Sequence, residues 1–202
     1  MKDIRTMKHI FLDIETTGLK PVLHEIIEIC IITEEEDGSL DIYEQKIQPV
    51  NLELASKKAL EINGFNHDEW CHARSFSDCA HEIADRIKGK DKLIIGHNPK
   101  FDVDFIEEHL FRNALTLKRI RTFDTASLAY EHLEPLGLES LSLTAIRRFL
   151  GWKVEGSHRA LKDAEDARRL FHLLRRAGIF LRFRIKMRVQ LHRFLGFLRR
   201  VI

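Results

Sequence analysis

Four acidic residues and one histidine carry the chemistry that this sequence can support. They are Asp13 and Glu15 in HIFLDIETTGL, Asp102 in HNPKFD, and His158 and Asp163 in GSHRALKDA. Carboxylate oxygens are the ligands that Mg²⁺ and Mn²⁺ prefer, so four converging carboxylates can hold two such ions. An imidazole beside them can accept a proton from water near neutral pH. This chemistry hydrolyses phosphodiesters, provided that the fold brings the five residues together.

The first two carboxylates follow a short apolar run. Residues 9–13 predict a buried strand that ends in a turn at TTG. Side chains two positions apart on a strand share a face, so Asp13 and Glu15 would lie side by side and repel each other unless a cation is present. An isolated D-x-E is more often an ordinary acidic strand end, so the pair depends on the other motifs for its meaning.

The third carboxylate follows a second apolar run, residues 92–96, which predicts another strand. Asp102 would begin the next helix, predicted at residues 101–114 from its apolar stripe, and would face the strand ends. Asp104 competes for the role but lies about 200° further around the helix. The alternative interpretation is that Asp102 is an acidic residue favoured by the helix dipole.

His158 and Asp163 are five residues apart, but His97 and Asp102 share that spacing. Context separates the two histidines. A Gly-Ser pair before His158 indicates a loop, and the helix predicted at residues 159–177 places Asp163 in its first turns. His97 lies at a strand end, where a structural or substrate contact is the better interpretation.

The remaining pattern predicts an α/β domain with a mixed sheet, because three strands are followed by alternating helices and strands and then by helices. Further strands are predicted at residues 25–33, 40–50 and 120–123, and further helices at residues 52–62, from a cap at Ser75 or Ser77 through Ile87, and at residues 124–133 and 141–150.

Composition places the chain among soluble globular domains. Its 202 residues are 44% hydrophobic and 32% charged. No apolar run approaches the ~20 residues of a membrane span, and the N-terminus lacks a signal-peptide core, so no integral membrane segment is expected. Three cysteines without CxxC spacing favour reduced thiols, and a cytoplasmic location is expected.

Charge divides the chain into an acidic body and a basic end. Residues 175–202 carry nine Arg or Lys and no Asp or Glu, which leaves residues 1–174 with a net charge of −7. Residues 181–191 alternate like a strand, but a longer apolar stripe over residues 180–201 favours an amphipathic helix. This segment could pack on the domain or on a second copy, grip phosphates, or meet a membrane surface or a polymerase subunit.

Together the three motifs resemble those of the DEDDh family of DnaQ-like 3′-5′ exonucleases, to which the proofreading epsilon subunit of bacterial DNA polymerase III belongs. The resemblance covers about residues 8–177 and implies a ribonuclease H-like fold, with a mixed five-stranded sheet flanked by helices. It makes Asp13, Glu15, Asp102 and Asp163 the metal ligands and His158 the general base. The tyrosine-bearing branch of the family has a shorter spacing to its last aspartate, so the histidine branch fits better.

The resemblance implies hydrolysis at single-stranded DNA or RNA 3′ ends, with two Mg²⁺ or Mn²⁺ ions per site and release of nucleoside 5′-monophosphates. The exonuclease domain would span residues 1–177, followed by a basic amphipathic segment at residues 178–202. A DNA polymerase subunit or a second copy could bind through residues 179–202. The alternative is a non-catalytic nucleic-acid or polymerase-binding module on the same fold. The motifs do not separate DNA from RNA, or a proofreading subunit from a free-standing nuclease.

The resemblance also suggests substrate contacts outside the five central residues. They are Thr16 and Thr17 at the terminal nucleotide, Asn63 and Phe65 in ALEINGF, and Asn98 at the terminal phosphate. The alternative interpretation makes all five ordinary turn and packing residues.

Overall fold

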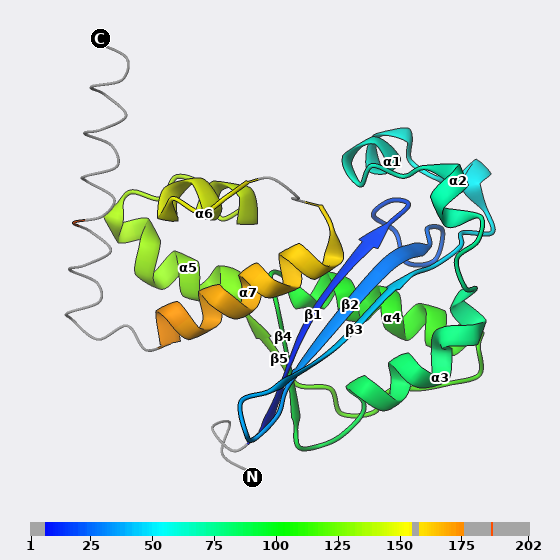
Figure 1. Cartoon of the computed structure of the whole chain (residues 1–202), viewed down its shortest axis with the longest axis horizontal. Helices are drawn as coiled ribbons and strands as arrows, with labels where there is room; N and C mark the ends of the chain where they lie inside the picture. The colour runs from blue at the N-terminus through cyan, green and yellow to red at the C-terminus, as the bar shows by residue number, and fades with distance from the viewer. Residues whose placement is uncertain (1–6, 155–157, 176–186, 188–202) are drawn as a thin grey trace.

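A single mixed sheet forms the centre of the computed structural model, which describes residues 7–154, 158–175 and 187 (Figure 1). The strands are β1 (Lys8–Thr16), β2 (Ile26–Glu34), β3 (Leu40–Lys46), β4 (Lys92–Gly96) and β5 (Thr122–Asp124). Their order in the sheet is β3-β2-β1-β4-β5. The pairs β1–β2 and β2–β3 are antiparallel, whereas β1–β4 and β4–β5 are parallel. The predicted α/β class and mixed five-stranded sheet are confirmed.

Helices cover both faces of this sheet (Figure 1). They are α1 (Lys57–Ile62), α2 (His67–Trp70), α3 (Phe76–Ile87), α4 (Pro99–Arg112), α5 (Thr125–Leu133), α6 (Leu143–Leu150) and α7 (Ala160–Arg175). Side chains of α3 and α4 share one hydrophobic cluster with the sheet, and α7 shares another. A third cluster joins α5, α6 and α7. In the described part of the chain, no helix combines the length and apolar character that a bilayer span requires.

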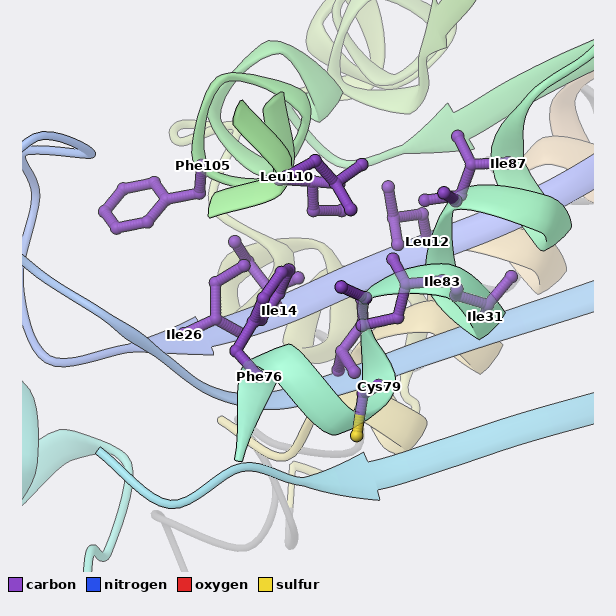
Figure 2. Close-up of a cluster of buried hydrophobic side chains, with 14 of the residues drawn as sticks. Leu12, Ile14, Ile26, Ile31, Phe76, Cys79, Ile83, Ile87, Phe105 and Leu110 are labelled. Carbon is purple, nitrogen blue, oxygen red and sulfur yellow. The ribbon is translucent and has the colours of Figure 1, made fainter. Parts of the chain in front are cut away.

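Alternation along β1 decides which side chains face which helices. Leu12 and Ile14 lie in the cluster formed with α3 and α4, where Figure 2 shows them beside Phe105 and Ile83. Phe11 points to the other face and meets Phe171 of α7 with ring centroids 5.7 Å apart. Each such fully buried side chain stabilises the fold by roughly 1.5–3 kcal/mol. Odd-numbered residues of β1 therefore face α7.

Three predicted elements differ from the structure. The strand predicted at residues 40–50 ends at Lys46. β1 continues beyond residue 13 to Thr16, because the ladder to β2 extends as far as the pair Thr16–Ile26. The single helix predicted at residues 52–62 is wrong. The segment is a 3₁₀ turn at Leu52–Leu54, followed by α1. Ser56 adopts an extended conformation and its side chain accepts a hydrogen bond from Ala59 N, which starts a new helix.

Candidate active site

β1 supplies the first two carboxylates. Asp13 and Glu15 lie on the face of β1 that is directed toward α7, as the alternation of this strand requires. Glu15 is buried, with 8% of its surface exposed, and Asp13 is half-buried. The register of β1 against β2 shifts between Glu15 and Thr16, and such irregularities redirect side chains near functional sites.

The start of α4 supplies the third carboxylate. Asp102 lies in the first turn, is 4% exposed, and accepts a hydrogen bond from Ile14 N at 3.0 Å. β4 lies close to β1 at Gly96, which has no side chain. If a larger residue stood there, its Cβ would lie only 3.0 Å from the Leu12 carbonyl oxygen. The competing Asp104 instead pairs with Lys100 on the same helix.

α7 and the residues before it supply the last carboxylate and the histidine. Asp163 lies in the first turn of α7. His158 is exposed and has a left-handed backbone, with φ of 63°. One possible ligand atom from each of Glu15, His158 and Asp163 lies within 4.8 Å of the others. The structure therefore brings residues from β1 and α7 close enough to share a cation.

The carboxylates lie close enough to raise one another's pKa values. Burial raises the pKa of Asp13 well above its usual range, and the charges of Asp102, Asp163 and Glu15 raise it further, in that order. Burial, followed by the charge of Asp163, raises the pKa of Glu15 to about 8. Burial also raises the pKa of Asp102, against two hydrogen bonds that lower it. A cluster of hard oxygen donors that repel each other fits a divalent cation.

Both ring nitrogens of His97 contact groups outside this cluster. Its Nδ1 lies 3.0 Å from Thr125 Oγ1, and its Nε2 lies 2.6 Å from the Leu141 carbonyl oxygen. Burial lowers the pKa of this imidazole. Its contacts join the end of β4 to α5 and to the segment before α6, which agrees with the structural interpretation.

Arg147 is a site residue that the motifs do not reveal. Its guanidinium donates to Asp163 Oδ1 at 2.6 Å and to Asp166 Oδ2 at 2.7 Å, and the residue is 1% exposed. The available signal is its position in α6, where it follows Leu143 and Ile146 on the buried face. A charged residue within an apolar stripe requires a buried partner.

Glu28 is a second residue that the motifs miss. It pairs with Glu15 across the β1–β2 ladder and is 1% exposed. Its carboxylate accepts a hydrogen bond from Ala160 N at 3.2 Å and forms an ion pair with Arg159 at 3.1 Å. It therefore ties the start of α7 to the sheet. The available signal is a glutamate within an isoleucine-rich strand.

Three of the five suggested substrate contacts hold the backbone after β1. Asn63 Nδ2 donates to the Thr16 carbonyl oxygen at 2.8 Å, and Thr17 Oγ1 accepts from Glu25 N at 2.9 Å. Thr16 Oγ1 donates to the Gly18 carbonyl oxygen at 2.7 Å. These bonds support turn and packing roles, and direct substrate contact stays a prediction.

The other two suggested contacts lie nearer the surface. Phe65 is half-buried and packs on Trp70, with ring centroids 5.2 Å apart. Asn98 is exposed and immediately precedes α4, with a left-handed backbone at φ of 67°. Their contact with substrate also stays a prediction.

A family model described as an exonuclease matches residues 10–171, so the chain belongs to the RNase T exonuclease family. The PolC-type DNA polymerase III of Thermotoga maritima is 31% identical over 175 residues, which cover 84% of this chain and 12% of that protein. The epsilon subunit of DNA polymerase III from Treponema pallidum is 28% identical over 159 residues, which cover 79% of this chain and 72% of that protein. The predicted membership of the DnaQ-like 3′-5′ exonuclease family is confirmed.

Solved structures agree on the fold. Escherichia coli exonuclease I in complex with a dT13 oligonucleotide superimposes with a TM-score of 0.74 at 18% identity. The match covers 84% of this chain and 41% of the exonuclease I chain. The predicted ribonuclease H-like fold is therefore confirmed. This chain spans only about an eighth of the length of the PolC-type relatives.

Proposed function

We propose that this chain is a metal-dependent 3′-5′ exonuclease that hydrolyses phosphodiester bonds at single-stranded 3′ ends and releases nucleoside 5′-monophosphates. The observation that carries the proposal is the convergence of carboxylates from three separate elements beside one exposed histidine: Asp102 of α4 is bonded to Ile14 N of β1, and Glu15 of β1 lies near Asp163 of α7. Isolated acidic strand ends and helix starts do not require such convergence. Family membership supports the same reaction.

The four carboxylates of Asp13, Glu15, Asp102 and Asp163 would hold two Mg²⁺ or Mn²⁺ ions. Their donor set consists of carboxylate oxygens, and burial together with mutual repulsion makes the cluster costly without cations. When bound, such ions activate water and neutralise charge on the entering and leaving oxygens.

His158 is proposed as the general base. It is exposed and near Glu15 and Asp163, so its imidazole can accept a proton from the attacking water. The water oxygen forms a bond to the phosphorus of the last phosphodiester, and the bond from phosphorus to the 3′ oxygen breaks. That oxygen takes up a proton from the solvent and becomes the new 3′ hydroxyl, while the terminal nucleoside leaves as its 5′-monophosphate.

Single-stranded DNA is the first substrate to test, because relatives are named as DNA polymerase III proteins and exonuclease I was solved with an oligonucleotide of deoxythymidines. RNA is the second substrate to test. Thr16, Thr17, Asn63, Phe65 and Asn98 are proposed to line the path of the terminal nucleotides. A polymerase subunit or a second copy is proposed to bind through residues 179–202, which lie outside the described residues except for Met187.

Product analysis on end-labelled DNA and RNA with Mg²⁺, Mn²⁺ or EDTA tests this proposal. We expect shortening from the 3′ end with either metal, none with EDTA, and no cleavage by Asp13→Ala. The matched control is Asp104→Ala, which removes an exposed pair with Lys100 and should cleave normally. Unchanged turnover of Asp13→Ala would reject the metal assignment. An absence of metal-dependent shortening would favour the non-catalytic nucleic-acid or polymerase-binding module.

A further inference from the structure

The buried guanidinium of Arg147 joins α6 to two acidic residues of α7. Arg147 Nη2 lies 2.6 Å from Asp163 Oδ1, and Arg147 Nε lies 2.7 Å from Asp166 Oδ2. The Arg147 side chain therefore binds Asp163, a proposed metal ligand, through Nη2 and the Asp166 carboxylate through Nε.

Asp166 holds the Arg147 guanidinium from a buried position. It is 1% exposed, and Lys162 Nζ also donates to it at 2.9 Å. With two cationic partners on one buried carboxylate, the position of the Arg147 guanidinium is fixed at its Nε end. The Nη2 end is then fixed relative to Asp163, because the guanidinium is planar and rigid.

Stability alone is a weak explanation for a buried arginine at this position. Leu143, Ile146 and Leu150 occupy the rest of the buried face of α6, and the last two pack with residues of α5 and α7. Well-packed apolar residues often stabilise a core as much as a buried ion pair does, since desolvation offsets the attraction between the charges. The arrangement is better explained by the geometry that it imposes on Asp163.

We propose that Arg147, held by Asp166, is a positioning residue that fixes the Asp163 carboxylate toward Glu15 and His158. This inference rests on the proposed metal site. Partners that hydrogen-bond to metal ligands orient them, and their loss typically lowers metal affinity or activity about 10- to 100-fold. Arg147 acts through Asp163 and needs no contact with substrate.

Charge and geometry can be separated by substitution. Arg147 also lowers the pKa of Asp13 through its charge, so a neutral replacement would change both properties at once. Arg147→Lys keeps the positive charge but cannot present two fixed nitrogens to two carboxylates. Its matched control is Arg168→Lys, because Arg168 Nε on α7 makes an ion pair of 2.7 Å with Glu34, which is not one of the proposed metal ligands.

Mn²⁺ affinity is measured by calorimetry on the full chain without DNA, together with kcat and KM on single-stranded DNA. We expect Arg147→Lys to bind Mn²⁺ about tenfold more weakly and to lose kcat with little change in KM. Arg168→Lys should match the wild type in Mn²⁺ affinity, kcat and KM. Wild-type Mn²⁺ affinity and kcat in Arg147→Lys would overturn the proposal.

A double variant covers the case in which Arg147→Lys does not fold. Arg147→Met with Asp166→Leu removes both buried charges, so its melting temperature should stay near that of the wild type while Mn²⁺ binding weakens. Wild-type Mn²⁺ affinity in the folded double variant would also overturn the inference. If the wild type itself binds no Mn²⁺, the proposed function fails instead.

Discussion

His158 is the residue whose role is most open to experiment. It is exposed, has a left-handed backbone and lies beside Glu15 and Asp163, so it could act as a base or as a metal ligand. We predict that His158→Ala slows cleavage about 10²- to 10⁴-fold while Mn²⁺ affinity is retained. His81→Ala, on the exposed face of α3, is the control and should cleave normally.

The pH dependence of the rate and the Mn²⁺ affinity together decide between the two roles of His158. Loss of Mn²⁺ affinity in parallel with the rate would make the residue a ligand. A pH profile that His158→Ala leaves unchanged would reject its role as the base.

Among the site residues, the sequence predicts the position of those whose placement depends on local periodicity. Asp13 and Glu15 follow from strand alternation, and Asp102 follows from its place at a helix start. Arg147 and Glu28 could not be assigned roles from the motifs, because their partners come from α7 and become neighbours only when α6, β2 and α7 pack together. Their one local signal is a charge at a buried position, which does not identify the partner.

Among the elements, the end of β1 depends on α1. Asn63 caps α1 and donates to the Thr16 carbonyl oxygen from a buried position. We predict that Asn63→Ala lowers the free energy of unfolding by about 1–3 kcal/mol, because the Thr16 carbonyl oxygen loses its donor. Urea denaturation measures this loss. Lys58→Ala, exposed on the same helix, should change the free energy of unfolding by less than about 0.5 kcal/mol.

The same variant tests the suggested substrate contact. If Asn63→Ala unfolds at the wild-type urea concentration, the bond to Thr16 does not support the turn. A raised KM for DNA without lost stability would then favour direct contact between Asn63 and the nucleic acid.

Element boundaries show where sequence patterns are insufficient. The apolar spacing of residues 52–62 fits one helix, but Ser56 N donates to the Thr17 carbonyl oxygen at 2.8 Å and draws the chain out of the helical conformation. That bond joins residues far apart in the sequence, so local spacing cannot predict it. The long α4 is predicted to within two residues of both observed ends and α7 to within one residue of its observed start, because their apolar stripes are continuous. The predicted end of α7 at residue 177 lies outside the described residues.

For the whole molecule, the acidic cluster makes stability depend on pH and metal. The pKa of Glu15 is raised from 4.5 to about 8, so the folded protein retains a proton that the unfolded chain releases between these values. The free energy of unfolding of EDTA-treated protein should therefore fall as pH rises from about 4.5 to 8. Added Mn²⁺ should raise the melting temperature more at pH 8 than at pH 5.5, since cations compete with protons for the carboxylates.

Thermal melts with EDTA and with Mn²⁺ at both pH values test this expectation. Asp13→Asn provides the comparison, because one carboxylate fewer should flatten the pH dependence of the EDTA-treated protein. An equal effect of Mn²⁺ at the two pH values would contradict a cluster that is protonated in the metal-free state.

The separation of charge between the body and the end of the chain belongs to the same scale. Residues 1–174 carry a net charge of −7, which opposes binding of a polyanion, whereas residues 175–202 carry nine positive charges. The predicted boundary between residues 177 and 178, and the segment beyond it, lie outside the described residues except for Met187. If the segment grips phosphates, its positive charges are needed, and if it packs, its apolar residues are needed.

Two variants distinguish these roles. Replacing Arg182, Arg184 and Lys186 with Gln keeps the apolar residues, and we predict that it reduces the slope of log affinity for single-stranded DNA against log salt by about 2. Deletion of residues 179–202 should reduce that slope further without changing the oligomeric state, measured by light scattering. Aggregation or loss of a dimer on deletion, with an unchanged salt slope in the triple variant, would instead assign the segment to packing on the domain or on a second copy.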